Sequence, residues 1–123
     1  MTFTWPGKVI LIAEDEDVNF KFLEKVLEDT NVSIIRAKNG REALEILDNK
    51  THVDLVLMDI RMPEMDGYDT TIEIKKKYKI PVVAQTAYNI DGGKEKGYES
   101  GCDDYIVKPI NISKLLVIID KYI

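Results

Sequence analysis

The chain has little of what marks a secreted or membrane-spanning protein. Its 123 residues include one cysteine, Cys102, so no disulfide can form within it, which is compatible with a reducing compartment. No apolar run reaches the roughly 20 residues that a transmembrane helix needs. The apolar run near the start is short and ends in four acidic residues at 14–17, unlike a secretory signal peptide. A cytoplasmic location without membrane contact is therefore expected.

Basic residues are also in the minority. Lys and Arg number 17 against 22 Asp and Glu, which gives a formal net charge of −5. Non-specific binding to nucleic acid depends on Lys and Arg that neutralise phosphates, so direct contact with nucleic acid is not expected. Cys102 is expected to be a small buried hydrophobic residue. The single histidine, His52, follows an expected helix and precedes a strand, which favours a surface or loop position.

Short β-rich segments alternate with segments of helical spacing, in a composition that is typical of one globular domain. Strands are expected at residues 8–13, 32–37, 53–58, 81–86 and 104–108. Five strands alternating with five helices predict an α/β fold, a doubly wound parallel sheet with helices on both faces. The first and third strands are continuously apolar, which favours the centre of the sheet, whereas Ser33 and Arg36 favour an edge for the second.

Apolar residues that recur every three or four positions indicate the helices. The expected inward faces are Val18, Phe22, Leu23, Val26 and Leu27; Ala43, Leu44 and Leu47; and Ile112, Leu115, Leu116 and Ile119. Asn111 is expected to cap the last helix, and Gly101 to end the helix before it.

Polar residues follow or end four of the expected strands. Glu14 and Asp15 follow the first strand, and Asp59 follows the third. Thr86 ends the fourth strand, and Lys108 ends the fifth. A doubly wound sheet binds ligands at the C-terminal ends of its strands, which is where these residues lie. If the first and third strands are neighbours, three carboxylates converge, and their repulsion demands raised pKa values or a cation. Mg²⁺ suits them because it prefers oxygen ligands and also binds phosphate, for which a hydroxyl and an ammonium group are suitable flanks.

Each of these residues also has a simpler interpretation. Glu14 or Asp15 could cap the first helix, and Asp59 could belong to a turn. Thr86 alone is typical of a strand, and Lys108 alone of a solvated surface. Because all five lie at the same edge of the expected sheet, a joint site is favoured.

At these residues the chain resembles the receiver domain of two-component response regulators. The motifs are AEDED at 13–17, LVLMDIRMPEMDG at 55–67, QTAY at 85–88 and DDYIVKPI at 103–110. The resemblance implies a flavodoxin-like sheet with the strand order 2-1-3-4-5. It also implies a receiver domain at residues 8–123, preceded by an N-terminal lead-in at residues 1–7.

The resemblance assigns the acidic residues to metal and phosphoryl binding. Asp59 matches the phosphoacceptor. Asp15, Asp59 and the backbone carbonyl of Arg61 match direct ligands of Mg²⁺, with Mn²⁺ as an alternative. Glu14 stands where many members have Asp, and it matches an acid that reaches the metal through water.

The remaining motif residues match positions that bind phosphate or respond to it. Lys108 matches the lysine that contacts the phosphoryl group, and the bond from it to Pro109 matches one that is cis in the family. Thr86 matches the switch hydroxyl, and Tyr105 the aromatic residue that changes rotamer with it. Arg61 and Tyr88 match two variable positions that tune dephosphorylation.

The function that the resemblance implies is two-component signal transduction. The chain would accept a phosphoryl group from a phosphohistidine on a histidine kinase or a histidine phosphotransfer protein. It would not be an enzyme, although it would assist its own phosphorylation and dephosphorylation. A downstream protein would read the change at the fourth helix and fifth strand. The segment 89–100 carries Gly92, Gly93 and Gly97, which indicates either a weak, easily shifted helix or a loop before a shorter one.

Two other functions fit the fold less well. An aspartyl-nucleophile phosphatase needs a substrate cap and a general acid close after Asp59, where the chain instead has Arg61. A flavodoxin-like nucleotide-binding protein needs a phosphate loop after the first strand, where the acids at 14–17 would repel phosphate.

Within the family two origins stay open. The chain is either a single-domain regulator or the receiver segment of a hybrid sensor kinase. EDEDVN at 14–19 and the TWPGK lead-in favour the hybrid kinase, with Trp5 packed on the base of the domain.

Overall fold

The sheet has the predicted architecture. A computed structural model of the chain describes residues 2–62, 66–86 and 101–123. Five parallel strands form one sheet in the order β2-β1-β3-β4-β5. The strands are β1 (Val9–Ala13), β2 (Ser33–Ala37), β3 (Leu55–Asp59), β4 (Val82–Thr86) and β5 (Asp104–Val107). The order 2-1-3-4-5 is therefore confirmed, with β2 at an edge as predicted.

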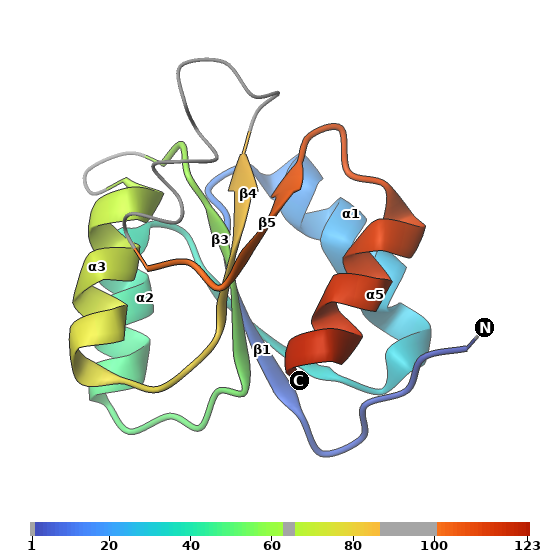
Figure 1. The fold of residues 1–123 in the computed structure, drawn as a ribbon, viewed down its shortest axis with the longest axis horizontal. Coiled ribbons are helices and arrows are strands. Elements are labelled where there is room, and N and C mark those ends of the chain that lie inside the picture. Colours follow the sequence, from blue (N-terminus) through green and yellow to red (C-terminus); the bar gives the residue numbers. More distant parts are fainter. Residues whose placement is uncertain (1, 63–65, 87–100) are drawn as a thin grey trace.

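Helices cover both faces of the sheet (Figure 1). The helices α1 (Asp17–Leu27) and α5 (Ile112–Tyr122) lie on one face, and α2 (Gly40–Asp48) and α3 (Gly67–Lys77) on the other. A 3₁₀ turn, η1 (Glu28–Thr30), follows α1. The helix expected within residues 89–100 lies outside the described residues, as does Tyr88.

Alternate strand residues fill two cores, one under each pair of helices. The core under α1 and α5 includes Ile10, Ile12, Leu57, Val83, Leu115 and Ile119. The core under α2 and α3 includes Leu11, Val56, Met58, Ala84, Leu47 and Ile74. Because both faces are covered, β3 is buried along its whole length.

The predicted inward face of α1 was partly wrong. Val18 and Phe22 are 78% and 42% exposed, whereas Leu23 and Leu27 are buried. Phe20 instead packs against the core with them. The inward stripe therefore follows the i, i+3, i+7 positions from Phe20, which turns Val18 and Phe22 toward solvent.

The last helix follows the prediction more closely. Leu115 and Ile119 are buried, although Ile112 in the first turn is exposed. Asn111 caps the helix as predicted, because its side chain accepts a hydrogen bond from the backbone N–H of Lys114 at 3.0 Å.

Several single residues lie where the sequence indicated. Cys102 is buried, and the side chain of His52 is exposed beside Asp54. Gly101 has a φ of +102°, a backbone conformation suited to glycine, although the helix that it was expected to end lies outside the described residues. None of the described helices has the length and apolar character needed to cross a membrane.

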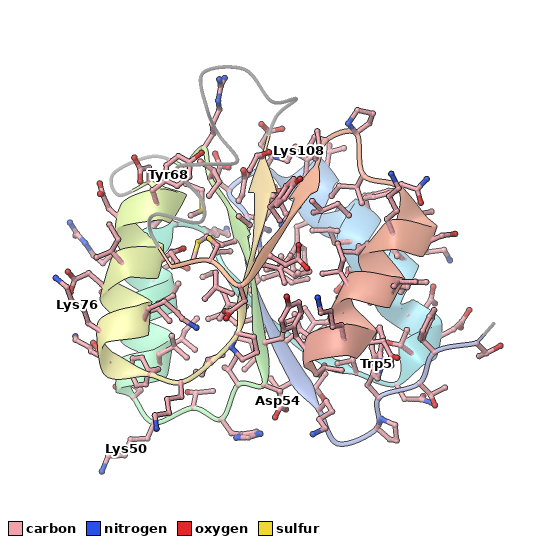
Figure 2. All side chains as sticks on the ribbon, in the orientation of Figure 1. Trp5, Lys50, Asp54, Tyr68, Lys76 and Lys108 are labelled. Atoms are coloured by element: carbon pink, nitrogen blue, oxygen red, sulfur yellow. The ribbon has the colours of Figure 1, made fainter. Side chains whose placement is uncertain are left out.

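The lead-in packs on the base of the domain. Trp5 is 5% exposed, and its indole Nε1 donates a hydrogen bond to Asp120 Oδ1 at 2.8 Å. Its backbone N–H donates to the carbonyl of Thr30 at 2.7 Å. Figure 2 shows Trp5 and Lys108 at opposite ends of the sheet. The predicted packing of Trp5 on the base is thus confirmed.

Candidate functional site

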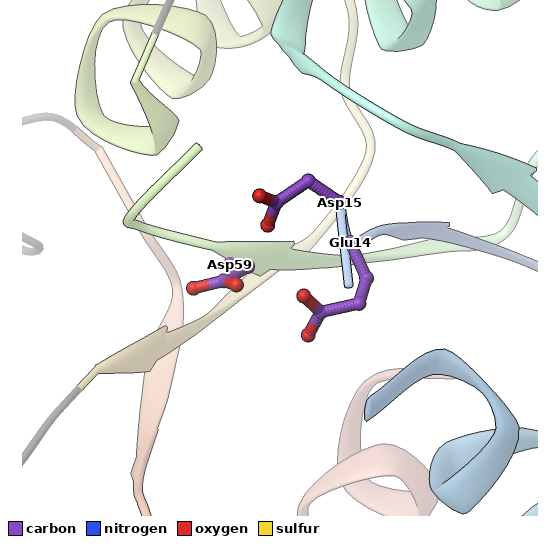
Figure 3. A group of neighbouring side chains, drawn as sticks. All are labelled: Glu14, Asp15 and Asp59. Atoms are coloured by element: carbon purple, nitrogen blue, oxygen red, sulfur yellow. The ribbon is translucent and has the colours of Figure 1, made fainter. Parts of the chain in front are cut away.

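Three carboxylates converge where β1 and β3 end (Figure 3). Glu14 and Asp15 follow β1, Asp59 ends β3, and one oxygen from each lies within 4.8 Å of the others. Glu14 is 0% exposed and Asp59 is 3% exposed. The convergence predicted from neighbouring strands is therefore confirmed, with Glu14 and Asp59 buried and Asp15 on the exposed side of the cluster.

Glu14 has a raised pKa in this cluster, and burial is the largest cause. Burial, the charge of Asp59 and a hydrogen bond with Asp59 raise the pKa of Glu14 from 4.5 to about 7. The Oε2 atom of Glu14 accepts a hydrogen bond from the backbone N–H of Glu16 at 3.2 Å. The Oε1 atom is buried and has no hydrogen-bond partner among the described residues.

Asp59 receives donors from two directions. Lys108 Nζ donates to Asp59 Oδ1 at 3.1 Å, and the backbone N–H of Arg61 donates to the same oxygen at 3.2 Å. Lys108 follows β5, and its own backbone N–H donates to the carbonyl of Thr86 at 2.7 Å. The bond from Lys108 to Pro109 is cis. The ammonium group therefore approaches the acids from the side of β4 and β5.

The other described residues of the predicted site differ in how far they are buried. Thr86 is buried at the end of β4. Tyr105 of β5 is half-buried and packs against the core under α2 and α3. Arg61 is exposed.

Gly67 allows the closest backbone approach to Asp59. A Cβ atom at Gly67 would lie 2.5 Å from the carbonyl oxygen of Asp59 and 2.7 Å from the Cα of Ile60. The backbone N–H of Gly67 also donates to the carbonyl of Ile60 at 3.0 Å. The start of α3 therefore sets the position of the chain after β3. Sequence reasoning missed this role, although the Asp-Gly pair before a helix was the available signal.

Arg36 holds the loop that carries Glu14. Its Nε donates to the carbonyl oxygen of Glu14 at 3.1 Å, and its Nη1 lies 2.8 Å from Asp17 Oδ1. Its guanidinium carbon lies 4.6 Å from the ring centroid of Phe20. The sequence indicated only an edge strand here, because the residues that Arg36 contacts come from a separate loop and helix.

The site suits a hard divalent cation. Mg²⁺ prefers carboxylate and carbonyl oxygens, and the three acids supply them at one point. The buried, unpartnered Oε1 of Glu14 fits such an environment, because a nearby cation or its water would compensate it. Asp59, one of the three acids, also has the ammonium group of Lys108 in contact.

Comparison with known proteins identifies the family to which the chain is similar. Residues 10–120 match the family model described as the response regulator receiver domain. The polar-differentiation response regulator DivK of Brucella ovis is 36% identical over 119 residues, which cover 94% of this chain and 96% of DivK.

Solved structures show the same similarity. One is the signal receiver domain of a signal transduction histidine kinase from Syntrophus aciditrophicus, which matches with a TM-score of 0.87 and 33% identity. The match covers 94% of this chain and 89% of that chain. The receiver domain of the Saccharomyces cerevisiae response regulator Ssk1, crystallised with the histidine phosphotransfer protein Ypd1, has a TM-score of 0.86 and 30% identity. That match covers 97% of this chain and 90% of the other.

Proposed function

Because the chain belongs to the response regulator receiver domain family of two-component signalling, we propose that it accepts a phosphoryl group on Asp59. The observation that carries the proposal is the contact of Lys108 Nζ with Asp59 Oδ1 beside Glu14 and Asp15. This contact supports the proposal because it brings a carboxylate and a positive charge together at the C-terminal ends of the strands.

The proposed reaction is an in-line transfer from a phosphohistidine. An oxygen of Asp59 forms a bond to phosphorus while the phosphorus–nitrogen bond breaks, and the imidazole leaves with the electron pair of that bond. The product is an acyl phosphate on Asp59. Charge spreads over three phosphoryl oxygens in the transition state, where the Lys108 ammonium, the Thr86 hydroxyl and the Arg61 backbone N–H stabilise it.

The proposed metal site uses Asp15, Asp59 and the backbone carbonyl of Arg61, with Glu14 acting through water. Mg²⁺, or Mn²⁺ as an alternative, would supply positive charge there for the acids and the phosphoryl oxygens. The carboxylate oxygens within 4.8 Å of one another support this assignment.

The donor is proposed to be a histidine kinase or a histidine phosphotransfer protein. The complex of Ssk1 with Ypd1 supports this class of partner. Val18 and Phe22 offer the donor apolar contacts, because they are exposed on the helix that starts beside Glu14 and Asp15.

The phosphoryl group is proposed to act through Thr86 and Tyr105. Thr86 would turn toward the new acceptor and Tyr105 would move inward, so that β5 and the segment 89–100 present a changed face to a downstream protein. Arg61 and Tyr88 would tune the lifetime of the acyl phosphate.

We also propose that the chain is a phosphoacceptor that assists its own reactions and is not itself an enzyme. Residues 1–7 would form a lead-in to a receiver domain at residues 8–123, and the protein would be cytoplasmic.

Mass spectrometry with acetyl phosphate and Mg²⁺ tests the assignment. The chain should gain one acid-labile phosphoryl group, and the variant Asp59→Asn should gain none. Asp69→Asn, at an exposed carboxylate in the first turn of α3, is the matched control and should label fully. Full labelling of Asp59→Asn would show that Asp59 is not the acceptor.

A further inference from the structure

Gln85 is a buried amide on a sheet face that is mostly apolar. It is 1% exposed, and neither Oε1 nor Nε2 has a hydrogen-bond partner among the described residues. Val83, two positions earlier on β4, packs in the core under α1 and α5, so Gln85 points to the same side. An unpaired buried amide is destabilising, so its presence on this face needs a compensating partner.

Gln85 also helps to line a pocket on this face of the sheet. Its volume is about 360 Å³, within the usual size of small-molecule sites. It is lined by α1 on one side and the segment after β5 on the other: Glu14, Asn19, Phe22, Leu23, Gln85, Lys108, Pro109 and Ile110. The pocket therefore combines apolar walls with one unsatisfied amide and shares two residues with the acidic site.

We propose that this pocket binds a small uncharged molecule with a primary amide or urea group on an apolar ring. Such a group donates to Gln85 Oε1 and accepts from Nε2, which satisfies both unpaired atoms at once. The ring would lie against Phe22, Leu23 and Ile110. The lining has one acid and one base, so its formal charge favours neither a cation nor an anion over a neutral ligand.

The ligand would lie next to the phosphoacceptor, because Glu14 and Lys108 line both sites. Binding is nevertheless a separate property from phosphoryl transfer. It is tested on the unphosphorylated, metal-free chain, so its failure leaves the proposed function untouched.

The test is an NMR titration with benzamide and, as a matched probe, acetophenone, in which a methyl group replaces the NH₂. Benzamide should give saturable shifts of the Gln85 side-chain amide and of the Leu23 and Ile110 methyl groups. It should bind about tenfold more tightly than acetophenone, because only benzamide pairs both amide atoms.

The variant Gln85→Met keeps the volume and removes the amide. It should fold with an equal or higher Tm, because it removes an unsatisfied group, and should bind both probes equally. Lys21→Ala, on α1 outside the pocket, is the control and should keep the preference for benzamide.

Two results would overturn the proposal. One is the absence of saturable benzamide shifts at Leu23 and Ile110 in the unsubstituted chain, which means that water alone compensates Gln85. The other is equal binding of benzamide and acetophenone by the unsubstituted chain, which means adventitious apolar binding only. Both are read without the Gln85→Met variant, so they stand even if that variant does not fold.

Discussion

Lys108 and Asp59 are 49 residues apart in the chain, yet their side chains meet at 3.1 Å at the carboxyl edge of the sheet. The contact spans β4, because Asp59 ends β3 and Lys108 follows β5. A lysine held in this position can stabilise negative charge that develops on a group bound to Asp59.

Lys108→Met should therefore slow phosphorylation by acetyl phosphate by about 10²-fold, the usual cost of removing one donor from a developing negative charge. The affinity for Mg²⁺ should change much less, because the acids that bind it remain. The acid-labile phosphate formed over time measures the phosphorylation rate, and calorimetry measures the affinity for Mg²⁺. Lys114→Met, at an exposed lysine of α5, is the control. Equal loss of phosphorylation and metal affinity would argue against direct contact with the phosphoryl group.

The pKa of Glu14 predicts how stability depends on pH. The folded chain holds a proton on Glu14 up to about pH 7, whereas the unfolded chain loses it near pH 4.5. The free energy of unfolding of the metal-free chain should therefore fall between these values as pH rises, on the order of 2–3 kcal/mol from this group. Urea unfolding at pH 5 and pH 8, followed by Trp5 fluorescence, measures it.

Glu14→Gln should remove this component of the pH dependence and stabilise the metal-free chain at pH 8. It should also weaken Mg²⁺ binding. An unchanged difference between pH 5 and pH 8 in the variant would assign the effect to another group.

Gly67→Ala should disturb the phosphoacceptor through the backbone. The added Cβ would overlap the carbonyl of Asp59, so the chain must shift, at a cost of about 1–3 kcal/mol. Because Asp59 moves with it, phosphorylation should slow as well. Chemical denaturation and labelling rates measure the two effects.

Gly7→Ala is the matched control for that variant. Gly7 has a φ of +79°, and no atom of the described residues lies within 4 Å of an added Cβ. Ala should cost stability through backbone strain, roughly 1–2 kcal/mol, and leave the labelling rate unchanged. A normal labelling rate in Gly67→Ala would show that the overlap relaxes away from Asp59.

Trp5→Phe should lower the free energy of unfolding by about 1–2 kcal/mol without affecting phosphorylation. It removes the hydrogen bond to Asp120 and part of a buried ring, at the end of the sheet far from Lys108. Circular dichroism during urea unfolding measures the loss. Asp120→Asn, which keeps an acceptor oxygen, should cost less. A slower labelling rate in Trp5→Phe would reveal coupling between the two ends.

The position of the site was predictable because it depends on two simple rules. Apolar runs marked the strands, and the ends of parallel strands meet at one edge, so Glu14, Asp15 and Asp59 had to converge once β1 and β3 were neighbours. The strand order itself came from the resemblance, since periodicity alone does not fix it.

The missed features depend on contacts between distant segments. Arg36 looked like an edge residue, but it bonds the carbonyl of Glu14, 22 residues away. The amide of Gln85 could be placed on β4, but its lack of a partner among the described residues follows only from what surrounds it. The face of α1 was misjudged because Val18 and Phe22 have helical spacing relative to Leu23 and Val26, and only the packed sheet shows which side is covered.

The burial of Trp5 at the end of the sheet opposite the acids also determines what its fluorescence reports. Its indole is the only one in the chain, and it is shielded from ions or phosphate that bind at the other end. Quenching by direct contact with an ion at the acids is therefore not expected, because Trp5 lies at the other end of the sheet. Any change in its emission during a magnesium titration would report a rearrangement transmitted along the whole length of the strands.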